Sequence, residues 1–218
     1  MSPPMRVLVT GAAGFIGSHV VTQLLADGHT VVGIDDFSTG STGNLAHIPT
    51  DRPVRLIEGS ILDPDALHDA LSVDGTPVDA IVHLAARPSV PRSIADPVAS
   101  HEANATGTLR VLDAARALDD PLVIVASSSS VYGANPVLPK REDLATQPLS
   151  PYAVSKLATE QYALAWQHSY GMRTLAFRFF NVFGPRQAPG HAYAAVIPAF
   201  VHAWLIGEPL TVHGDGTQ

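Results

Sequence analysis

The sequence predicts a doubly wound α/β fold, in which helices cover both faces of a parallel sheet. Short runs rich in Val, Ile and Leu alternate with longer segments of helical periodicity over the first 180 residues. The short runs are continuously apolar, which is typical of parallel strands buried on both faces. Regular alternation of strand and helix points to the same class, and ligands of such sheets bind beyond the carboxyl ends of the strands.

Six strands and four helices follow from this pattern. The strands are the apolar runs, at residues 7–9, 31–34, 54–57, 80–84, 122–126 and 174–177. The helices are the periodic segments between them, at residues 15–27, 64–71, 97–118 and 151–170. Ser150 suits the N-cap of the last helix, and Pro151 suits its first position, where a backbone N–H is not needed.

The residues after Phe180 have a different character. A turn-rich segment covers residues 184–190, and we expect a helix at 196–206 and a short strand at 210–212. The sequence therefore predicts two regions, a sheet domain over residues 1–180 and a smaller region over residues 181–218.

Composition narrows the classes of function. Of the 218 residues, 46% are hydrophobic and 15% are charged, as in a well-filled globular protein. Thirteen Lys and Arg face twenty Asp and Glu, and the net charge of -7 argues against a wide basic surface for nucleic acid. The absence of Cys excludes disulfides, thiolate zinc sites and Cys nucleophiles. The ten His include no His-x-His or His-Glu-x-x-His pair, so no metal site is expected.

Two further observations bear on where in the cell the protein is expected to be. The longest apolar runs are far shorter than the roughly 20 residues that cross a bilayer. The N-terminus leads directly into a strand pattern, without the basic and apolar regions of a signal peptide. With no Cys to suggest an oxidising compartment, we expect a soluble cytoplasmic protein with neither a membrane nor a nucleic-acid partner.

A glycine-rich loop follows the first predicted strand. Gly11, Gly14 and Gly17 are spaced three apart and open the first helix, where backbone N–H groups and the helix dipole favour a pyrophosphate. The alternative is a tight turn without a ligand. Asp35 ends the second strand, where an acidic residue can hold the ribose hydroxyls of a dinucleotide. No Lys or Arg occurs in the ten residues after Asp35, which favours NAD over NADP.

Hydroxyl groups follow the fifth predicted strand. Residues 127–130 are four Ser, and because a buried strand precedes them directly, we interpret them as side chains at the carboxyl edge of the sheet and not as a linker. Tyr152 and Lys156 are four residues apart and share one helix face, although such a pair is commonly a surface feature. A lysine and an oxidised nicotinamide would both favour the phenolate. Lowering a Tyr pKa from about 10 by about 3 units requires roughly 4 kcal/mol.

These motifs together resemble the extended short-chain dehydrogenase/reductases, and within them the NAD-dependent nucleotide-sugar 4-epimerases that act on UDP-glucose or UDP-glucuronate. The similar stretches occur in the family's order, at residues 10–17, 34–40, 83–86, 104–108, 127–133, 150–156 and 178–185. The resemblance implies a Rossmann NAD-binding domain over residues 1–180. It implies that residues 181–218 are the start of a smaller, truncated substrate-binding region.

The resemblance also implies roles for individual residues. The catalytic residues would be Ser128, Tyr152 and Lys156. The residues expected to bind NAD are Gly11, Gly14, Phe15, Ile16, Gly17, Asp35, Asp36, Phe37, Ser38, Thr39, Gly40, Ser60, Ile61, Leu84, Ala85, Ala86, Asn104, Ser127, Tyr152, Lys156 and Phe179. The residues expected to bind a UDP-sugar are Arg87, Ser128, Ser129, Ser130, Tyr152, Asn181, Val196 and His213.

The implied reaction inverts C4 of the sugar through a 4-keto intermediate, with NAD bound throughout and Tyr152 as the base. A 4,6-dehydratase or decarboxylase of the same family is the alternative, but Ser129 and Ser130 stand where dehydratases carry an Asp-Glu pair. An NAD-binding regulator without catalysis is an alternative of another class. The resemblance further implies a homodimer through the helices near 100–118 and 151–170, whose apolar residues could instead serve the intramolecular core.

Three positions depart from the family. Ser60 replaces an Asp that contacts adenine, Ala195 replaces an Asn near the diphosphate, and His213 replaces an aromatic residue that stacks on uracil. Two arginines, Arg87 and Arg92, could hold a phosphate or a sugar carboxylate, or could be solvated loop charges.

Overall fold

The computed structural model describes residues 3–187, 196–212 and 215. Two compact units divide the chain, Met1–Phe180 and Asn181–Gln218, and each is described by itself. Among the described residues, none of the helices combines the length and the apolar character needed to cross a bilayer.

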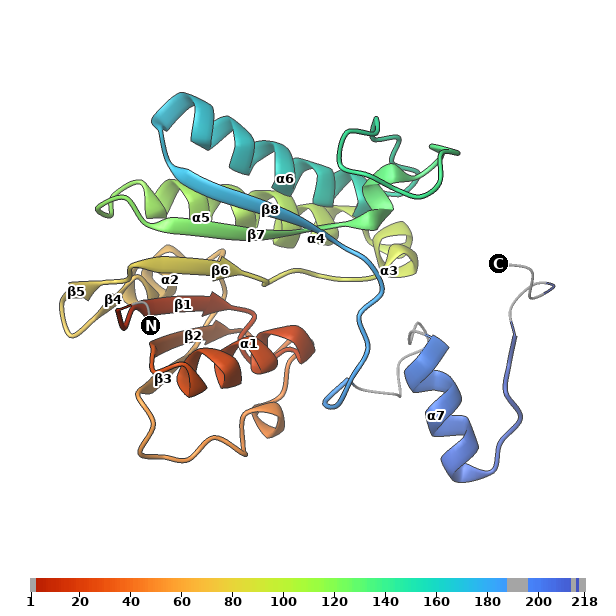
Figure 1. The fold of residues 1–218 in the computed structure, drawn as a ribbon, viewed down its shortest axis with the longest axis horizontal. Coiled ribbons are helices and arrows are strands. Elements are labelled where there is room, and N and C mark those ends of the chain that lie inside the picture. Colours follow the sequence, from red (N-terminus) through yellow and green to blue (C-terminus); the bar gives the residue numbers. More distant parts are fainter. Residues whose placement is uncertain (1–2, 188–195, 213–214, 216–218) are drawn as a thin grey trace. The chain divides into compact units, whose positions relative to one another are not determined.

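The first unit contains a six-stranded parallel sheet (Figure 1). In spatial order its strands are β3 (Val54–Glu58), β2 (Thr30–Asp35), β1 (Arg6–Thr10), β6 (Ala80–His83), β7 (Leu122–Ser128) and β8 (Arg173–Phe179). All neighbouring pairs are parallel. The strand order reverses direction at β1, and β1 and β6 lie side by side there. The predicted doubly wound α/β class is confirmed, with the carboxyl ends of all six strands at one edge.

Helices pack on both faces of this sheet. One face carries α1 (Phe15–Ala26), and the other carries α2 (Pro64–Ala70), α5 (Gly107–Ala115) and α6 (Pro151–Tyr170). The short helices α3 (Val90–Ala95) and α4 (Pro97–His101) pack against α6. The alternation of side chains along β1 separates two cores: Leu8 packs in the cluster with α2, α5 and α6, and Val7 and Val9 pack in the cluster with α1. Leu8 and Ile81 are fully buried, and burial of each stabilises the fold by about 1.5–3 kcal/mol.

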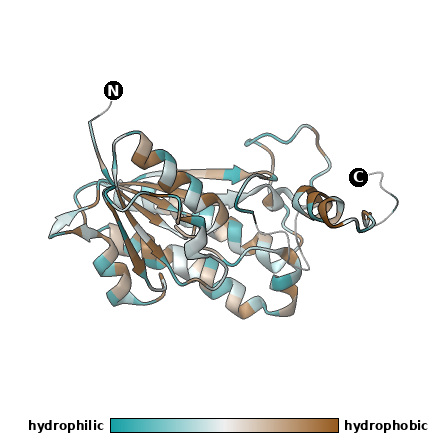
Figure 2. Cartoon of the chain, turned by 90° about the horizontal axis from the view of Figure 1, so that it is seen from below, coloured by the Kyte–Doolittle hydropathy of each residue, from teal (hydrophilic) through white to brown (hydrophobic). Residues whose placement is uncertain are grey.

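The edge strand β8 differs from the prediction that every strand is covered on both faces. Its burial alternates, and Leu175 and Phe177 are each 45% exposed. Neighbouring strands cover β8 on one side only, and α6 covers one of its faces. Figure 2 shows the hydrophobic colours concentrated in the strands of the sheet.

The predicted helix at 97–118 is interrupted. The segment begins as α4, continues as a π-helical turn over Glu102–Thr106 and ends as α5. Gly107 lies against Ile61, whose Cδ1 would be 2.5 Å from a Cβ at this position. The Thr108 hydroxyl donates to the Asn104 carbonyl at 2.6 Å. Single π-helical turns within helices are often found at functional sites, and Asn104 lies in this one.

Several short elements were not predicted. The loop after β6 contains α3, and the DG turn at Asp74 and Gly75 joins a hairpin of β4 (Ser72–Val73) and β5 (Thr76–Pro77). Two 3-10 turns are Thr42–Asn44 and Ser129–Tyr132. In the second unit, α7 (Val196–Ile206) confirms the predicted helix, whereas residues 210–212 are not a strand.

Candidate active site

The glycine loop joins β1 to α1 at the carboxyl edge of the sheet. Gly11 has a φ of +69°, and a Cβ there would lie 2.9 Å from the Ala85 nitrogen. A Cβ at Gly17 would lie 2.0 Å from the Gly11 carbonyl oxygen. Both positions therefore require glycine, because the loop, the first turn of α1 and the segment after β6 approach one another backbone to backbone.

The N-terminus of α1 presents free donors. The first backbone bond of the helix runs from Ser18 N to Gly14 O at 3.0 Å, so Phe15, Ile16 and Gly17 have N–H groups without an acceptor in the described part of the chain. Gly14 is the N-cap and supplies no side-chain cap, and the first turn holds no acidic residue. This donor set fits a pyrophosphate, since it combines open N–H groups with the positive end of the helix dipole.

Asp35 lies beneath this loop, at the end of β2, and is 7% exposed. Its Oδ2 accepts from Ala13 N at 2.8 Å and its Oδ1 accepts from Phe37 N at 2.9 Å. Burial raises the pKa of Asp35, and these backbone donors oppose that shift only in part. A Cβ at Gly40 would be 2.8 Å from Oδ1, so the following turn also closes on the carboxylate.

The other residues predicted to bind the adenosine part of NAD follow β2 and β3, and their side chains make local contacts. Ser38 donates from both its N–H and its hydroxyl to Asp36 Oδ1, at 2.9 and 2.6 Å. The Ser60 hydroxyl accepts from Leu62 N at 3.2 Å. Ile61 packs its side chain in the core, so its backbone alone is open to a ligand.

Ser128 and Tyr152 meet at the carboxyl end of β7. The Ser128 side chain lies close enough to the Tyr152 phenol to lower its pKa. Ser128 Oγ also accepts from Ser130 N at 3.1 Å and from Ser130 Oγ at 2.9 Å. The structure thus brings together three residues that the sequence predicted for the site.

The protonation of this site differs from the prediction. Burial raises the pKa of Tyr152, and the hydrogen bond with Ser128 lowers it by less. The Lys156 Nζ is buried and donates to the Ala126 carbonyl at 2.9 Å. Burial also lowers the pKa of Lys156 to about 8. In the chain by itself, Tyr152 is therefore a protonated phenol.

The first turn of α6 is held by two serines. Ser150 caps the helix by accepting from Ala153 N at 3.1 Å. Ser93, fully buried in α3, accepts from Tyr152 N at 3.0 Å. These bonds fix the backbone that carries the Tyr152 side chain.

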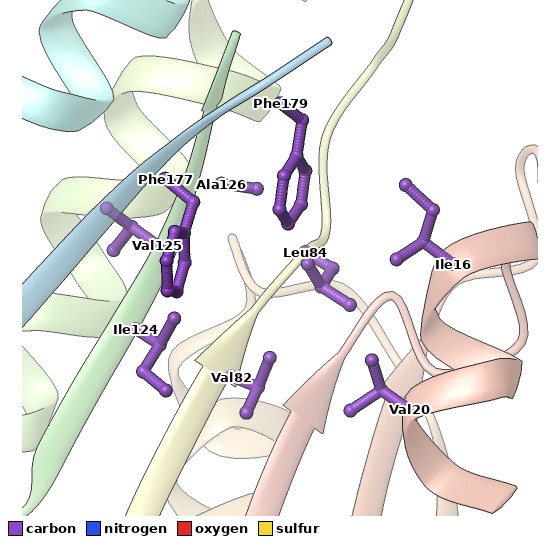
Figure 3. A pocket seen from close by; sticks show the side chains of 9 residues that line it. All are labelled: Ile16, Val20, Val82, Leu84, Ile124, Val125, Ala126, Phe177 and Phe179. Atoms are coloured by element: carbon purple, nitrogen blue, oxygen red, sulfur yellow. The ribbon is translucent and has the colours of Figure 1, made fainter. Parts of the chain in front are cut away.

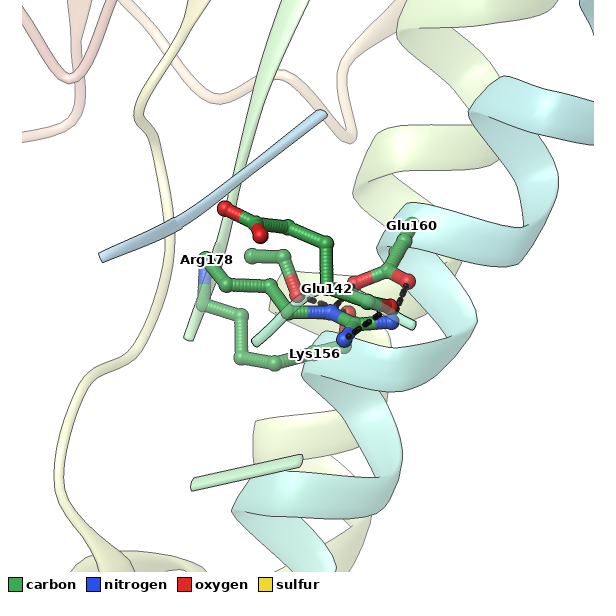
Figure 4. Close-up of polar contacts among 5 residues, drawn as sticks. Glu142, Lys156, Glu160 and Arg178 are labelled. Atoms are coloured by element: carbon green, nitrogen blue, oxygen red, sulfur yellow. Dashed lines mark hydrogen bonds and ion pairs between the residues drawn. The ribbon is translucent and has the colours of Figure 1, made fainter. Parts of the chain in front are cut away.

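An ion pair that the sequence did not predict lies one helical turn beyond Lys156 (Figure 4). Glu160 and Arg178 are joined by two contacts of 2.6 and 2.9 Å, and their side chains are 6% and 14% exposed. Ser127 donates to Glu160 Oε2 at 2.9 Å, and Arg178 Nη1 donates to the Glu142 carbonyl at 3.2 Å. Burial tends to raise the pKa of Glu160, but the bonds from Arg178 and Ser127 leave it below its ordinary value.

Ser127 was predicted to bind NAD, and its side chain belongs to the Glu160–Arg178 ion-pair cluster. Its hydroxyl is engaged with α6 instead, at Glu160 and at the Lys156 carbonyl. The four-residue spacing from Tyr152 to Lys156 to Glu160 is the sequence signal that could have identified Glu160.

Asn104, in the π-helical turn, connects α6 to the segment after β6. Its Oδ1 accepts from Arg87 N at 2.7 Å, and its Nδ2 donates to Ser155 Oγ at 2.9 Å. The Arg87 side chain forms an ion pair with Asp96 at 3.1 Å, and Arg92 lies in α3. The turn therefore positions the backbone at Arg87 beside α6.

A hollow of about 240 Å³ lies between α1 and strands β6 to β8 (Figure 3). Ile16 and Val20 of α1 face Phe177 and Phe179 of β8 across it. The two Phe rings are stacked, with centroids 6.1 Å apart. Its lining is entirely apolar, so it does not suit a phosphate or a sugar hydroxyl.

Four further positions that the sequence analysis singled out on the substrate side lie after residue 180. Asn181 and Val196 belong to the second unit. His213 and Ala195 lie outside the described residues. Within the described ranges, no group of three or more His, Asp or Glu is arranged to hold a metal ion.

Comparison with known proteins adds independent information. A family model described as the NAD dependent epimerase/dehydratase family matches residues 7–218. The UDP-glucose 4-epimerase of Mycolicibacterium smegmatis is 42% identical over 215 residues, which cover 98% of this chain and 67% of the relative.

Two solved structures are also similar. A UDP-N-acetylglucosamine 4-epimerase from Methanobrevibacter ruminantium, in complex with UDP-N-acetylmuramic acid, aligns with a TM-score of 0.93 at 40% identity, over 100% of this chain and 68% of that one. The dTDP-glucose 4,6-dehydratase DesIV of Streptomyces venezuelae, with NAD bound, aligns with a TM-score of 0.88 at 38% identity, over 98% and 66%. The chain thus spans about two thirds of the length of these proteins.

Proposed function

Because the chain belongs to the NAD dependent epimerase/dehydratase family, we propose that it binds NAD and inverts C4 of a nucleotide-linked sugar of the UDP-glucose or UDP-glucuronate type. The observation that carries this proposal is that Ser128 ends β7 beside the Tyr152 side chain, at the same sheet edge as the glycine loop. The family relationship and the 4-epimerase names of similar proteins support the reaction class.

The residues present fit NAD. The open N–H groups of Phe15, Ile16 and Gly17 would hold its pyrophosphate, and Asp35 would hold the ribose next to adenine. Ala85 and Ala86, just after β6, would line the cleft, and Lys156 would face the second ribose. When bound, NAD supplies a reversible acceptor for the hydride of C4 and a positive charge on its nicotinamide ring.

Tyr152 would move the proton. Its oxygen would take the proton of the C4 hydroxyl as the sugar passes to the 4-keto form, and would return it after the sugar presents its other face. Ser128 would hold the same sugar oxygen, since its side chain lies beside the Tyr152 phenol. Because burial keeps the phenol protonated in the chain alone, Tyr152 becomes a base only in the NAD-loaded protein.

The residues proposed to bind the sugar and its nucleotide are the ones that the family resemblance implies. Arg87, Ser129 and Ser130 belong to the first unit, and Asn181, Val196 and His213 belong to residues 181–218, which we propose as part of a substrate-binding region. A site of this kind must hold the diphosphate firmly and the sugar loosely, because C4 must present both faces to the same base.

We also propose a homodimer through α5 and α6. A surface depression there is lined by Leu109, Arg116, Trp166 and Tyr170 among others. The Arg116 guanidinium lies 4.1 Å from the centre of the Tyr170 ring. Trp166 Nε1 is buried without a hydrogen-bond partner among the described residues. An aromatic surface of this kind is typical of protein interfaces.

A 4,6-dehydratase activity is the second candidate, supported by the similarity to DesIV. Ser130 weighs against it, since a hydroxyl bonded to Ser128 takes the place of an acid/base carboxylate.

The test is incubation of the protein and NAD with UDP-glucose, UDP-glucuronate and UDP-N-acetylglucosamine, followed by chromatographic identification of the sugars. We expect the C4-inverted product from at least one of them. A 4-keto-6-deoxy product would establish the dehydratase instead. Binding of NAD without conversion of any of these sugars would contradict the epimerase and favour a regulator.

A further inference from the structure

His83 is a buried titratable residue that the proposed reaction does not use. It ends β6, one strand from the glycine loop, and is 3% exposed. Its Nδ1 lies 2.7 Å from Thr10 Oγ1, and its Nε2 lies 3.0 Å from Thr108 Oγ1. Thr10 immediately precedes the loop, and Thr108 lies in the first turn of α5.

The surrounding bonds determine which nitrogen of His83 carries the proton. Thr10 Oγ1 accepts from Leu84 N at 3.1 Å and from Ala85 N at 3.0 Å. A hydroxyl has two acceptor positions and one donor, so the Thr10 hydroxyl must donate to His83 Nδ1. Nδ1 is then the acceptor, and the neutral ring carries its hydrogen on Nε2, which donates to Thr108.

The chain of bonds continues to the catalytic helix. The Thr108 hydroxyl donates to Asn104 O at 2.6 Å. It also lies 3.1 Å from the hydroxyl of Thr159 in α6, which donates toward the carbonyl oxygens of Asn104 and Ser155. Asn104 Nδ2 donates to Ser155 Oγ, and Ser155 Oγ donates to Tyr152 O at 2.8 Å. These bonds lead from the glycine loop to the backbone carbonyl of Tyr152.

We propose that His83, as the neutral Nε2–H tautomer, is a positioning residue that couples the glycine loop to the helix carrying Tyr152 and Lys156. The bridge spans β1, β6, α5 and α6, so a shift of the loop on binding a dinucleotide is transmitted to the Tyr152 backbone. This inference rests on the proposed function only in taking the loop to be the NAD site. Burial, with a smaller contribution from the charge of Lys156, lowers the pKa of His83 to about 3, which keeps the ring neutral.

The first test is nitrogen NMR of the imidazole rings in the full chain, with His83 assigned by its loss in His83→Gln. We expect the Nε2–H tautomer, unchanged from pH 8 to pH 5. An Nδ1–H tautomer, or a ring that titrates over this range, would overturn the proposal. This measurement needs no dinucleotide.

The second test compares amide hydrogen exchange in three variants. Glutamine offers one acceptor and one donor, so His83→Gln should restore the bridge, whereas His83→Leu removes both bonds. We expect His83→Leu to speed exchange about tenfold in the glycine loop and in the first turns of α6, and His83→Gln to remain within about threefold of the wild type. Ile81→Ala, also buried in β6, is the control for loss of packing alone.

The same variants then separate this inference from the proposed function. We expect His83→Leu to weaken NAD binding about tenfold, equivalent to ~1.4 kcal/mol, and Ile81→Ala to leave the affinity unchanged. Equal effects of His83→Leu and His83→Gln, or faster exchange confined to β6, would overturn the coupling. Failure of the wild type to bind NAD would contradict the proposed function alone, because the tautomer and the exchange would still report on the bridge.

Discussion

Arg178 and Glu160 form a two-contact ion pair, with Nη2–Oε1 at 2.6 Å and Nε–Oε2 at 2.9 Å, that joins the edge strand β8 to helix α6. Arg178 pairs in register with Ser127 of β7, whose hydroxyl bonds to the same carboxylate. The ion pair therefore fixes the position of α6 along β7. This position places the Lys156 ammonium at the Ala126 carbonyl and the Tyr152 side chain beside Ser128.

Loss of this carboxylate should destabilise the fold strongly. In Glu160→Gln the Arg178 guanidinium stays buried without a counter-charge, which costs about 3–5 kcal/mol. We expect this loss in the free energy of unfolding measured with urea. Asp143→Asn is the control, since it breaks an exposed ion pair with Arg141 and should cost less than about 1 kcal/mol. Similar losses in the two variants would show that Glu160 has no special structural role.

Removal of the Tyr152 hydroxyl should abolish turnover and leave NAD binding intact. Tyr152→Phe deletes the proposed base, and general base catalysis typically contributes about 10²–10⁴-fold to the rate. The measurement is the rate of C4 inversion beside the NAD dissociation constant. Tyr162→Phe, on the same helix, is the control. Retention of more than about a tenth of the wild-type rate by Tyr152→Phe would remove Tyr152 from the mechanism.

A methyl group at Gly17 should close the proposed pyrophosphate site. The added Cβ of Gly17→Ala would lie 2.0 Å from Gly11 O, so the loop must move away from α1. We expect NAD affinity to fall by at least about 100-fold, equivalent to ~2.7 kcal/mol. Gly28→Ala is the control: Gly28 has a φ of +87° with nothing within 4 Å, so strain should cost about 1–2 kcal/mol of stability without changing NAD affinity. Unchanged NAD affinity in Gly17→Ala would place the dinucleotide elsewhere.

Acid should destabilise the fold through His83. Its pKa is about 3 in the folded chain and about 6.5 when unfolded, so below pH 6.5 the unfolded state binds a proton that the folded state does not. The free energy of unfolding should therefore fall between pH 6.5 and pH 3, by at most about 5 kcal/mol from this residue. His83→Gln should flatten that fall in urea titrations, whereas His68→Gln, on the exposed side of α2, should not. Equal pH profiles for wild type and His83→Gln would refute the burial of a neutral ring.

Sequence patterns were sufficient where local chemistry determines the structure. Val, Ile and Leu runs identified all six strands of the sheet. The four inner strands are apolar because both of their faces are buried, whereas the edge strands β3 and β8 are apolar but partly exposed. Tyr152 and Lys156 were identifiable because a four-residue spacing places side chains on one helix face. Pro151 and Ser150 marked the start of α6, and Ser150 does cap it.

Contacts between distant segments could not be predicted. Arg178 reaches Glu160 only because β8 pairs with β7 in one register, and no local pattern contains that register. The π-helical turn depends on the packing of Gly107 against Ile61, 46 residues earlier in the chain. The pKa of Tyr152 was expected to fall beside both Lys156 and a bound nicotinamide. In the chain alone, Lys156 donates to the Ala126 carbonyl, and burial raises the pKa of Tyr152.

The central claim is that Tyr152 lies in the NAD site and becomes a base there. Ultraviolet difference titration of wild type against Tyr152→Phe, with and without saturating NAD, measures its ionisation directly. We expect a Tyr152 pKa above the ordinary value of about 10 in the free chain, and a clear decrease when the positively charged ring of NAD is bound. A Tyr152 pKa that is the same with and without bound NAD would contradict the account.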